Sequence, residues 1–334
     1  MQRIVFRADG NHTIGFGHVY RTLALAGMLY NDFECVFAIN RPDGFIKDQI
    51  SKVCQVISLD TEYNYPLPDK MNAENQLPFD LQNVVDERDI VVVDGYHFGM
   101  GYQQGLKSIG CKQVWLDDLL RDYPFADAII NHAPGVDSED YNTNARLCLG
   151  LEYAILRKPF FMPLKPKDYT NKIAYISLGG SDYFGFTLKI CKALIATNSF
   201  NHIHILCSAQ FEETLLSNLR QLSTTHPITL HFNLSAQQIV EVMDACTHAF
   251  ISASTVLIES YSRGLKCFAG YYTQNQHLIY NGFVQNHLAG GLGDFNTITG
   301  EHINHLLAAE TEVGVLDKPL NSVENFIHLF EDLA

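Results

Sequence analysis

The stretch RIVFRADGNHTIGFGH (residues 3–18) has the pattern of a buried β-strand, a glycine-rich turn and the first residues of a helix. Residues 3–7 enclose a short apolar run typical of strands, and residues 19–30 are apolar on most helical faces. Such a helix packs between a sheet and another layer of the protein. The stretch therefore predicts the first strand–turn–helix unit of a parallel α/β fold.

The same alternation of short apolar runs and helical patterns continues along both halves of the chain. Further strands are predicted at residues 35–39, 90–93, 113–116, 128–130, 173–178, 203–207, 229–232, 249–252 and 266–269. Three prolines within residues 158–167 prevent regular structure there and mark a linker. We predict two Rossmann-like α/β domains, 1–160 and 161–334, with a last amphipathic helix at 320–334 that could pack back on the N-terminal domain.

Composition and charge exclude several classes of function. The net charge of −14, from 37 acidic and 23 basic residues, argues against a sequence-independent grip on nucleic acid. The opening residues carry two arginines, and no apolar run approaches the roughly eighteen residues that span a bilayer. We expect a cytoplasmic protein without stable membrane insertion. Residues 61–80, with three prolines, predict a long surface segment.

Metal and cofactor motifs are missing from the sequence. The eight cysteines are scattered, without a C-x-x-C pair or a Cys/His cluster at zinc spacing, and most are expected to be buried thiols. No Asp-x-Asp triplet occurs, although clustered carboxylates commonly hold the divalent cation in metal-dependent sugar transfer. Gly15 and Gly17 lack the third glycine of a dinucleotide-binding fingerprint. The sequence therefore favours a mechanism that uses neither metal nor cofactor.

Three Gly- or Ser-rich turns each follow a predicted strand and precede a predicted helix, which is where ligands bind in α/β sheets. In the first turn, Gly15 and Gly17 let the backbone approach a ligand, and a neutral imidazole of His18 at the helix start could act as a general base. A tight turn with a capping or packing histidine is an equally good reading of this spacing.

The other two turns suit phosphate groups. Residues 177–182 offer backbone amides around adjacent glycines, and residues 251–259 offer amides and hydroxyls to a pyrophosphate, with Glu259 placed to accept from ribose hydroxyls. Ser181 and Asp182 could equally be helix N-caps, and the last turn could be a capped helix.

Weaker polar candidates follow other strands. Tyr96 or His97 could face a ligand as donor or acid, because both come directly after the apolar run 90–93. Residues 117–118 end the next strand, where a capping role is at least as good an explanation. His202 and His204 share one strand face without a third metal ligand, so we expect no metal site there.

As an ordered set, these stretches resemble the nucleotide-sugar hydrolase family of pseudaminic acid biosynthesis, which removes UDP from UDP-2,4-diacetamido-2,4,6-trideoxy-β-L-altropyranose. The matching stretches are 7–9, 14–21, 94–96, 116–118, 153–157, 178–182, 251–255, Glu259 and 275–276. The family is similar in architecture to the peptidoglycan N-acetylglucosaminyltransferase. The resemblance therefore implies the GT-B fold, with two Rossmann-like domains facing each other across a cleft and UDP bound mainly by the second.

The resemblance also implies roles for individual residues. It makes His18 the base that activates water for an inverting attack on the anomeric carbon, and Tyr96 a catalytic residue that supports the sugar site. It implies a substrate-binding set of Arg7, Asp9, Gly15, Gly17, Arg21, Gly179, Gly180, Ser181, Asp182, Ser252, Ala253, Ser254, Thr255, Glu259, Asn275 and Gln276. No metal or cofactor belongs to it.

Two positions depart from the family pattern. Ile258 stands where some members carry Asn, and Gly95 stands where they carry His. Both lie near the expected sugar pocket, so the identity of the sugar stays open. The resemblance does not explain residues 284–334, and the sequence gives neither the oligomeric state nor the extent of domain closure.

Two alternatives to the hydrolase remain open. An inverting glycosyltransferase with the same fold would use His18 to deprotonate an acceptor hydroxyl instead of water, and fold does not separate the two. A non-catalytic nucleotide-sugar-binding subunit is the other alternative, although such a module has no need of a base.

Overall fold

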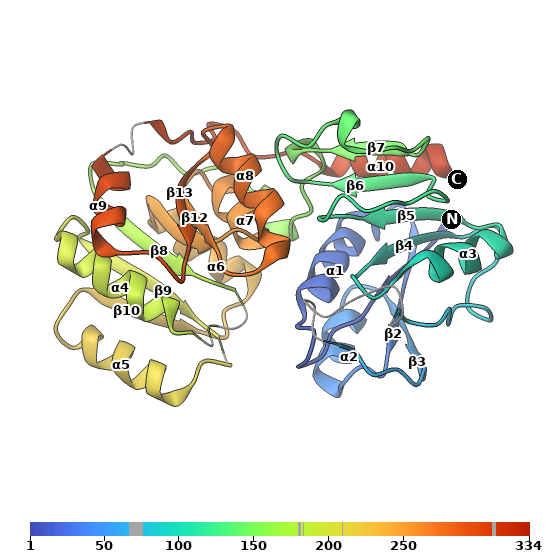
Figure 1. Cartoon of the computed structure of the whole chain (residues 1–334), viewed down its shortest axis with the longest axis horizontal. Coiled ribbons are helices and arrows are strands. Elements are labelled where there is room, and N and C mark those ends of the chain that lie inside the picture. The colour runs from blue at the N-terminus through green and yellow to red at the C-terminus, as the bar shows by residue number, and fades with distance from the viewer. Residues whose placement is uncertain (67–75, 180–181, 183, 209, 309–311) are drawn as a thin grey trace. The chain divides into compact units, whose positions relative to one another are not determined.

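The computed structural model describes residues 1–66, 76–179, 182, 184–208, 210–308 and 312–334, and the chain forms two compact units (Figure 1). Unit 1 comprises Met1–Lys158 and Asn321–Ala334, and unit 2 comprises Pro159–Leu320. The sequence prediction divides the chain after residue 160, within the proline-rich linker. Among the described helices, none is both long and apolar enough to cross a bilayer.

Unit 1 is built on a parallel seven-stranded sheet in the order β3-β2-β1-β4-β5-β6-β7. Its strands are β1 (Arg3–Ala8), β2 (Glu34–Asn40), β3 (Gln55–Leu59), β4 (Ile90–Asp94), β5 (Lys112–Leu116), β6 (Ala128–Asn131) and β7 (Arg146–Leu149), and its helices are α1 (Gly17–Leu29), α2 (Gly44–Ser51), α3 (Met100–Ile109) and α10 (Val323–Leu333). Every residue of β4 is buried, as expected of a parallel strand covered on both faces.

Unit 2 is built on a parallel six-stranded sheet in the order β10-β9-β8-β11-β12-β13. Its strands are β8 (Ile173–Ser177), β9 (His202–Cys207), β10 (Ile228–Phe232), β11 (His248–Ser252), β12 (Lys266–Tyr271) and β13 (Ala289–Asp294), and its helices are α4 (Phe186–Thr197), α5 (Glu213–Ser223), α6 (Ala236–Ala245), α7 (Thr255–Ser262), α8 (His277–Gln285) and α9 (Gly300–Ala308). The predicted α/β class with two parallel sheets is confirmed.

Three strands escape the sequence prediction. β3 and β7 are edge strands and therefore lack the long apolar runs of the central strands. β13 contains three glycines, which argue against a strand on propensity alone. The sheet needs two of them, because a Cβ on Gly290 would lie 2.7 Å from the Phe268 ring and one on Gly291 2.6 Å from the Tyr280 hydroxyl.

The predicted surface segment 61–80 is wrong in part. Residues 67–75 lie outside the described residues, but Leu77 is 3% exposed and joins the core of unit 1. Asp80 accepts hydrogen bonds from the buried Arg7 guanidinium. The sequence prediction missed the burial of both residues, because several nearby prolines indicate an irregular backbone but do not indicate exposure.

Both sheets have the same change of direction. In unit 1 the chain adds β2 and β3 on one side of β1, and then places β4 on the other side of β1. In unit 2 it adds β9 and β10 on one side of β8, and then places β11 on the other side of β8. In open α/β sheets, the carboxyl ends of the two strands at such a switch point flank the ligand-binding crevice. The fold therefore singles out the turns after β1 and β4 in unit 1, and after β8 and β11 in unit 2.

The last helix, α10, belongs to unit 1 (Figure 1). Phe326, Leu329 and Phe330 are fully buried, and the Phe330 ring lies 6.0 Å from the Phe33 ring. The Ser322 hydroxyl donates to the Ala154 carbonyl at 2.6 Å. The helix thus completes the core of the unit in which the chain begins.

We expect Phe330→Ala to lower the free energy of unfolding of unit 1 by about 3–5 kcal/mol, the range for a fully buried phenylalanine. Trp115, the single tryptophan of the chain, lies in β5 and reports unfolding of this unit by fluorescence during a urea titration. Phe232→Ala removes a 41% exposed ring from unit 2 and is the control. Equal shifts of the tryptophan transition in both variants would contradict the packing of α10.

Candidate active site

The turn after β1 is shaped by Asn11. Its side-chain oxygen accepts the backbone N–H groups of Thr13 and Ile14 at 2.8 and 3.1 Å, and its backbone pairs with Gly15. Gly15 has a φ of 76°, a conformation that favours glycine. The turn delivers His18 to the first turn of α1, a helix start that no side chain among the described residues caps.

His18 is paired with Asp94, which ends β4. The imidazole Nδ1 lies 2.8 Å from the Asp94 Oδ1, and 12% of the His18 side chain is exposed. A carboxylate only accepts, so Nδ1 carries the proton and donates it. In the neutral ring the lone pair lies on Nε2, for which the described residues supply no hydrogen-bond partner. This tautomer is the one that a general base requires.

Asp94 is fully buried and accepts from three side chains. Arg21 donates to both carboxylate oxygens, from Nη2 at 2.6 Å and from Nε at 2.8 Å, and the Thr22 hydroxyl donates at 3.1 Å. Burial by itself raises the pKa of Asp94, but the nearby Arg21 and His18 outweigh it and hold that pKa well below its usual range. Asp94 therefore stays ionised and keeps the His18 tautomer fixed.

A second carboxylate extends this cluster. Asp118 accepts from Arg21 Nη1 and from the Tyr96 hydroxyl, both at 3.0 Å. The Tyr96 ring meets the His18 ring edge-on at a centroid distance of 4.6 Å. Arg21 thus links the two carboxylates, and of these only Asp94 bonds the His18 ring. The Asp94 carboxylate stabilises an imidazolium formed when His18 takes up a proton.

Arg7 and Asp9 lie in a separate buried network. Asp9 accepts from Arg7, from the Asn40 backbone N–H, from the Tyr65 hydroxyl and from His97. Arg7 is 0% exposed and Asp9 1% exposed, and a substrate would have to displace these partners to reach them. The contact of Arg7 and Asp9 with substrate stays a prediction. In the structure their hydrogen bonds hold together the turns on which the candidate site is built.

The remaining unit 1 candidates divide between site and scaffold. Asp117 accepts the backbone N–H groups of Leu119 and Leu120 and the hydroxyls of Tyr123 and Tyr141, so it stabilises the loop after β5, which the structure describes in full and where no helix begins. Gly17 has open space around its Cα, as close approach of a ligand requires.

Asp94 and Asp118 are the site residues that the proposed substrate-binding set omits. Their signal was their position directly after the buried strands β4 and β5.

In unit 2, the turn after β11 leads into α7. The Ala253 N–H donates to the Gly270 carbonyl at 2.8 Å, and the hydroxyls of Ser252 and Ser254 lie 3.2 Å apart. Among the described residues no side chain caps α7, and its first turn, which begins at Thr255, holds no acidic residue. The N-terminal amides of a helix lack intrahelical partners, so this end is suited to a diphosphate.

The other turn of unit 2 is less open. Gly179 has a φ of 90°, while Gly180 and Ser181 lie outside the described residues. Asp182 accepts the backbone N–H groups of Phe186 and Thr187 at 2.8 and 2.7 Å. Its carboxylate thus pairs with the first amides of α4, whereas the N-cap position of that helix is Gly185.

The last candidates lie along α7 and after β12. Glu259 is 7% exposed within α7, and Ile258 is fully buried in the same helix. The Gln276 side-chain oxygen accepts the Tyr272 N–H at 2.9 Å, and Asn275 is half-buried beside it. Because the Ile258 side chain lies in the core, its departure from the family pattern has no direct effect on a surface pocket.

Metal-binding geometry is not found in the described part of the chain, where no three His, Cys, Asp or Glu side chains converge. His204 Nδ1 and His231 Nε2 lie 2.9 Å apart, and the His202 Nε2 is 2.9 Å from the Thr229 hydroxyl. These histidines bond to neighbours in the sheet.

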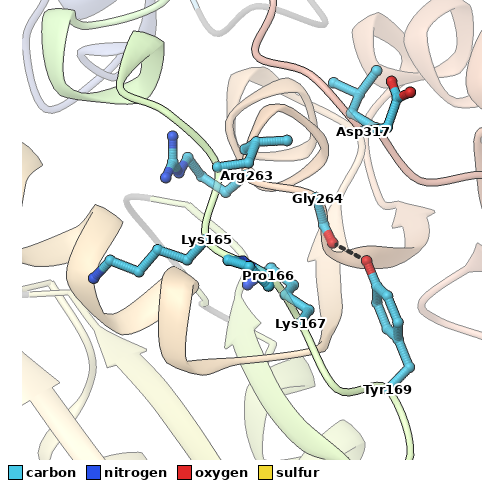
Figure 2. A pocket seen from close by; sticks show the side chains of 9 residues that line it. Lys165, Pro166, Lys167, Tyr169, Arg263, Gly264 and Asp317 are labelled. Atoms are coloured by element: carbon cyan, nitrogen blue, oxygen red, sulfur yellow. Dashed lines mark hydrogen bonds between the residues drawn. The ribbon is translucent and has the colours of Figure 1, made fainter.

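A hollow of about 220 Å³ lies beside the linker in unit 2 (Figure 2). Lys167 donates to the carbonyls of Met243, Asp244 and Cys246 at the end of α6. Arg263 is 1% exposed and donates to Asp244 and to the carbonyls of residues 160, 162 and 163. Lys167 and Arg263 have thus used their donors to hold the linker against α6, and Lys165, the third cation that lines the hollow, pairs with Asp244 at 3.5 Å.

None of the known protein-family profiles matches the chain, but individual proteins resemble it. The UDP-2,4-diacetamido-2,4,6-trideoxy-beta-L-altropyranose hydrolase of Campylobacter jejuni is 23% identical over 281 residues, which cover 82% of this chain and 93% of that protein. An uncharacterized protein of Methanocaldococcus jannaschii is 22% identical over 298 residues. The aligned region covers 85% of this chain but only 58% of the Methanocaldococcus protein, less than two thirds of its length.

Solved structures show the same fold. MurG of Acinetobacter baumannii superposes with a TM-score of 0.67 at 13% identity, over 99% of this chain and 100% of MurG. A Medicago truncatula protein in complex with UDP-glucose gives 0.63 at 12% identity, over 99% and 98% of the two chains. The calicheamicin glycosyltransferase gives 0.58 at 11% identity, over 99% and 94%. The predicted GT-B fold and the predicted resemblance to the hydrolase are confirmed.

The burial of Lys167 beside the linker predicts that stability depends on pH. Burial lowers the pKa of Lys167 from 10.5 to about 8. Between these values the unfolded chain binds more protons than the folded chain, so this group makes the free energy of unfolding rise with pH. We expect Lys167→Met to lack that rise when urea unfolding is followed by circular dichroism. Lys192→Met, which removes an exposed lysine of α4, controls for the lost charge, and parallel curves for wild type and Lys167→Met would contradict the burial.

Proposed function

We propose that this protein is a nucleotide-sugar hydrolase that releases UDP from a UDP-linked diacetamido-trideoxy hexose, in surface-glycan biosynthesis of the pseudaminic acid type. The observation that carries the proposal is the pairing of His18 with the buried, ionised Asp94 at the switch point of the first sheet. Sequence similarity to the Campylobacter jejuni hydrolase supplies the substrate class.

In the proposed reaction, His18 activates water. Nε2 removes a proton from the water molecule while its oxygen forms a bond to the anomeric carbon on the face opposite the diphosphate. The bond from that carbon to the diphosphate oxygen breaks, and its electron pair leaves with UDP. The anomeric configuration is therefore inverted. A positioned base of this kind contributes about 10²–10⁴-fold to the rate.

Asp94 and Arg21 act through His18. Asp94 holds the Nδ1–H tautomer and stabilises the imidazolium, while Arg21 keeps Asp94 ionised and oriented. Tyr96 bounds the base on one side, and we propose that it supports the sugar there.

In unit 2, the start of α7 is the proposed diphosphate site. The backbone amides at Thr255, with the hydroxyls of Ser252 and Ser254, stabilise the negative charge that develops on the departing diphosphate. Glu259 is the proposed acceptor for ribose hydroxyls, and Gly179, Asn275 and Gln276 are proposed to border the nucleotide. Such a site stabilises the leaving group without a metal ion.

A glycosyltransferase is the second candidate, because the fold shared with the calicheamicin glycosyltransferase suits either activity. The same His18–Asp94 pair would then deprotonate an acceptor hydroxyl. A non-catalytic binding subunit would have no use for a fixed base tautomer.

The test is incubation with a UDP-linked diacetamido-trideoxy hexose in ¹⁸O-water, with EDTA and without any acceptor. We expect UDP and a free sugar of inverted configuration with ¹⁸O on its anomeric carbon, followed by NMR and mass spectrometry. His18→Gln should lose at least 10²-fold in turnover while keeping UDP affinity, because the base is separate from the diphosphate site. If no UDP is released without an acceptor, the transferase is favoured. If His18→Gln keeps more than a tenth of the wild-type turnover, His18 is not the base.

Asp94→Asn keeps the side-chain volume but removes the charge that fixes the tautomer. We expect kcat to fall by about 10²–10⁴-fold with UDP affinity unchanged. Imidazole ¹⁵N shifts should show loss of the Nδ1–H tautomer of His18. Asp118→Asn is the matched control, because Asp118 bonds Arg21 and Tyr96 but not His18, and its kcat should fall much less. Equal losses in both variants, with the tautomer unchanged, would contradict the assigned role.

A further inference from the structure

A second carboxylate–histidine pair lies at the same edge of the first sheet. The His97 Nε2 lies 3.1 Å from the Asp9 Oδ2, and both side chains are buried. Asp9 follows β1 and His97 follows β4, whereas His18 follows β1 and Asp94 ends β4. The two pairs therefore cross-link the same two adjacent turns in opposite directions.

His97 is neutral in this position. Burial lowers its pKa although Asp9 opposes the change, so the imidazole donates Nε2–H to an ionised carboxylate. The rings packed on His97 are Phe98 at 4.2 Å and Tyr65 at 5.1 Å between centroids, and the Arg7 guanidinium also lowers its pKa. The pair is buried, and it anchors the turn after β4 to the turn after β1.

Gly95 makes this anchor possible. Its φ of 150° favours glycine, and a Cβ there would lie 2.8 Å from the His97 ring and 3.0 Å from the Phe98 ring. The His97 ring folds back over Gly95 to reach Asp9. The departure from the family pattern at position 95 thus has a structural reason in this chain.

The residue between Gly95 and His97 is Tyr96. Its backbone carbonyl accepts from Arg121 at 2.8 Å, its hydroxyl donates to Asp118, and its ring edge meets His18. A hydrogen bond to Asp94 fixes only one nitrogen of the His18 ring and leaves the ring free to tilt about that bond. Contact with Tyr96 removes this freedom.

We propose that His97, anchored on Asp9 and accommodated by Gly95, is a positioning residue that holds Tyr96 against His18 and so sets the direction of the His18 Nε2 lone pair. The inference rests on the proposed function for its catalytic consequence. Its structural part concerns unit 1 alone.

The test is a double-mutant cycle between His97→Phe and Tyr96→Ala, read as UDP release. In the wild-type background we expect His97→Phe to lower kcat about tenfold with KM changed less than twofold, equivalent to about 1.4 kcal/mol. In the Tyr96→Ala background the same change should cost less than twofold, because the residue through which His97 acts is gone. Tyr65→Phe is the matched control, since it removes another donor to Asp9 but keeps the ring that packs on His97, and its kcat should stay unchanged.

A measurement without turnover separates this inference from the proposed function. With 3-fluorotyrosine placed at Tyr96, we expect one narrow ¹⁹F resonance in the wild type and in Tyr65→Phe, and a shifted or broadened one in His97→Phe. Trp115 fluorescence would verify that each variant is folded. If the wild type releases no UDP, the proposed function is rejected, but the ¹⁹F comparison still tests whether His97 positions Tyr96. Additive losses in the cycle, or an unchanged ¹⁹F signal in His97→Phe, would overturn the role of His97.

Discussion

The structure of unit 1 depends on one buried charge. Asp94 sits at the end of a strand with no exposed surface, and a carboxylate there is costly unless every oxygen is paired. Three side chains of α1 satisfy it: His18, Arg21 and Thr22. This requirement fixes the helix against the sheet, selects the histidine tautomer and brings Arg21 to Asp118. The interaction that stabilises the fold therefore also orients the proposed base, His18.

The two units offer complementary chemistry. Unit 1 gathers ionised side chains around an imidazole, while the α7 turn of unit 2 offers backbone amides and hydroxyls and carries no acidic residue in its first turn. The division suits a reaction in which one partner accepts a proton and the other stabilises a departing anion. Under the proposed function, hydrolase and transferase would differ only in the species that loses its proton to the base.

The sequence predicted the fold well because buried parallel strands are continuous apolar runs, and it located the turns because strand, glycine and helix follow one another. It did not predict β13, whose glycines are set by Phe268 and Tyr280. It missed the partnership of Arg21 with Asp94, 73 positions away, because spacing carries no information on contacts between distant segments. Arg7, Asp9 and Asp182 have the residue types of ligand contacts, but internal partners take up their polar groups.

The return of α10 to unit 1 makes that unit discontinuous in the chain, with the whole of unit 2 inserted before Asn321–Ala334. During synthesis on a ribosome, the first unit therefore leaves the exit tunnel without the helix that covers Phe33. At about 5–20 residues per second it waits on the order of ten seconds or more for that helix. An apolar surface is open for this interval, so nascent chains of this protein should be clients of chaperones that shield it until α10 emerges.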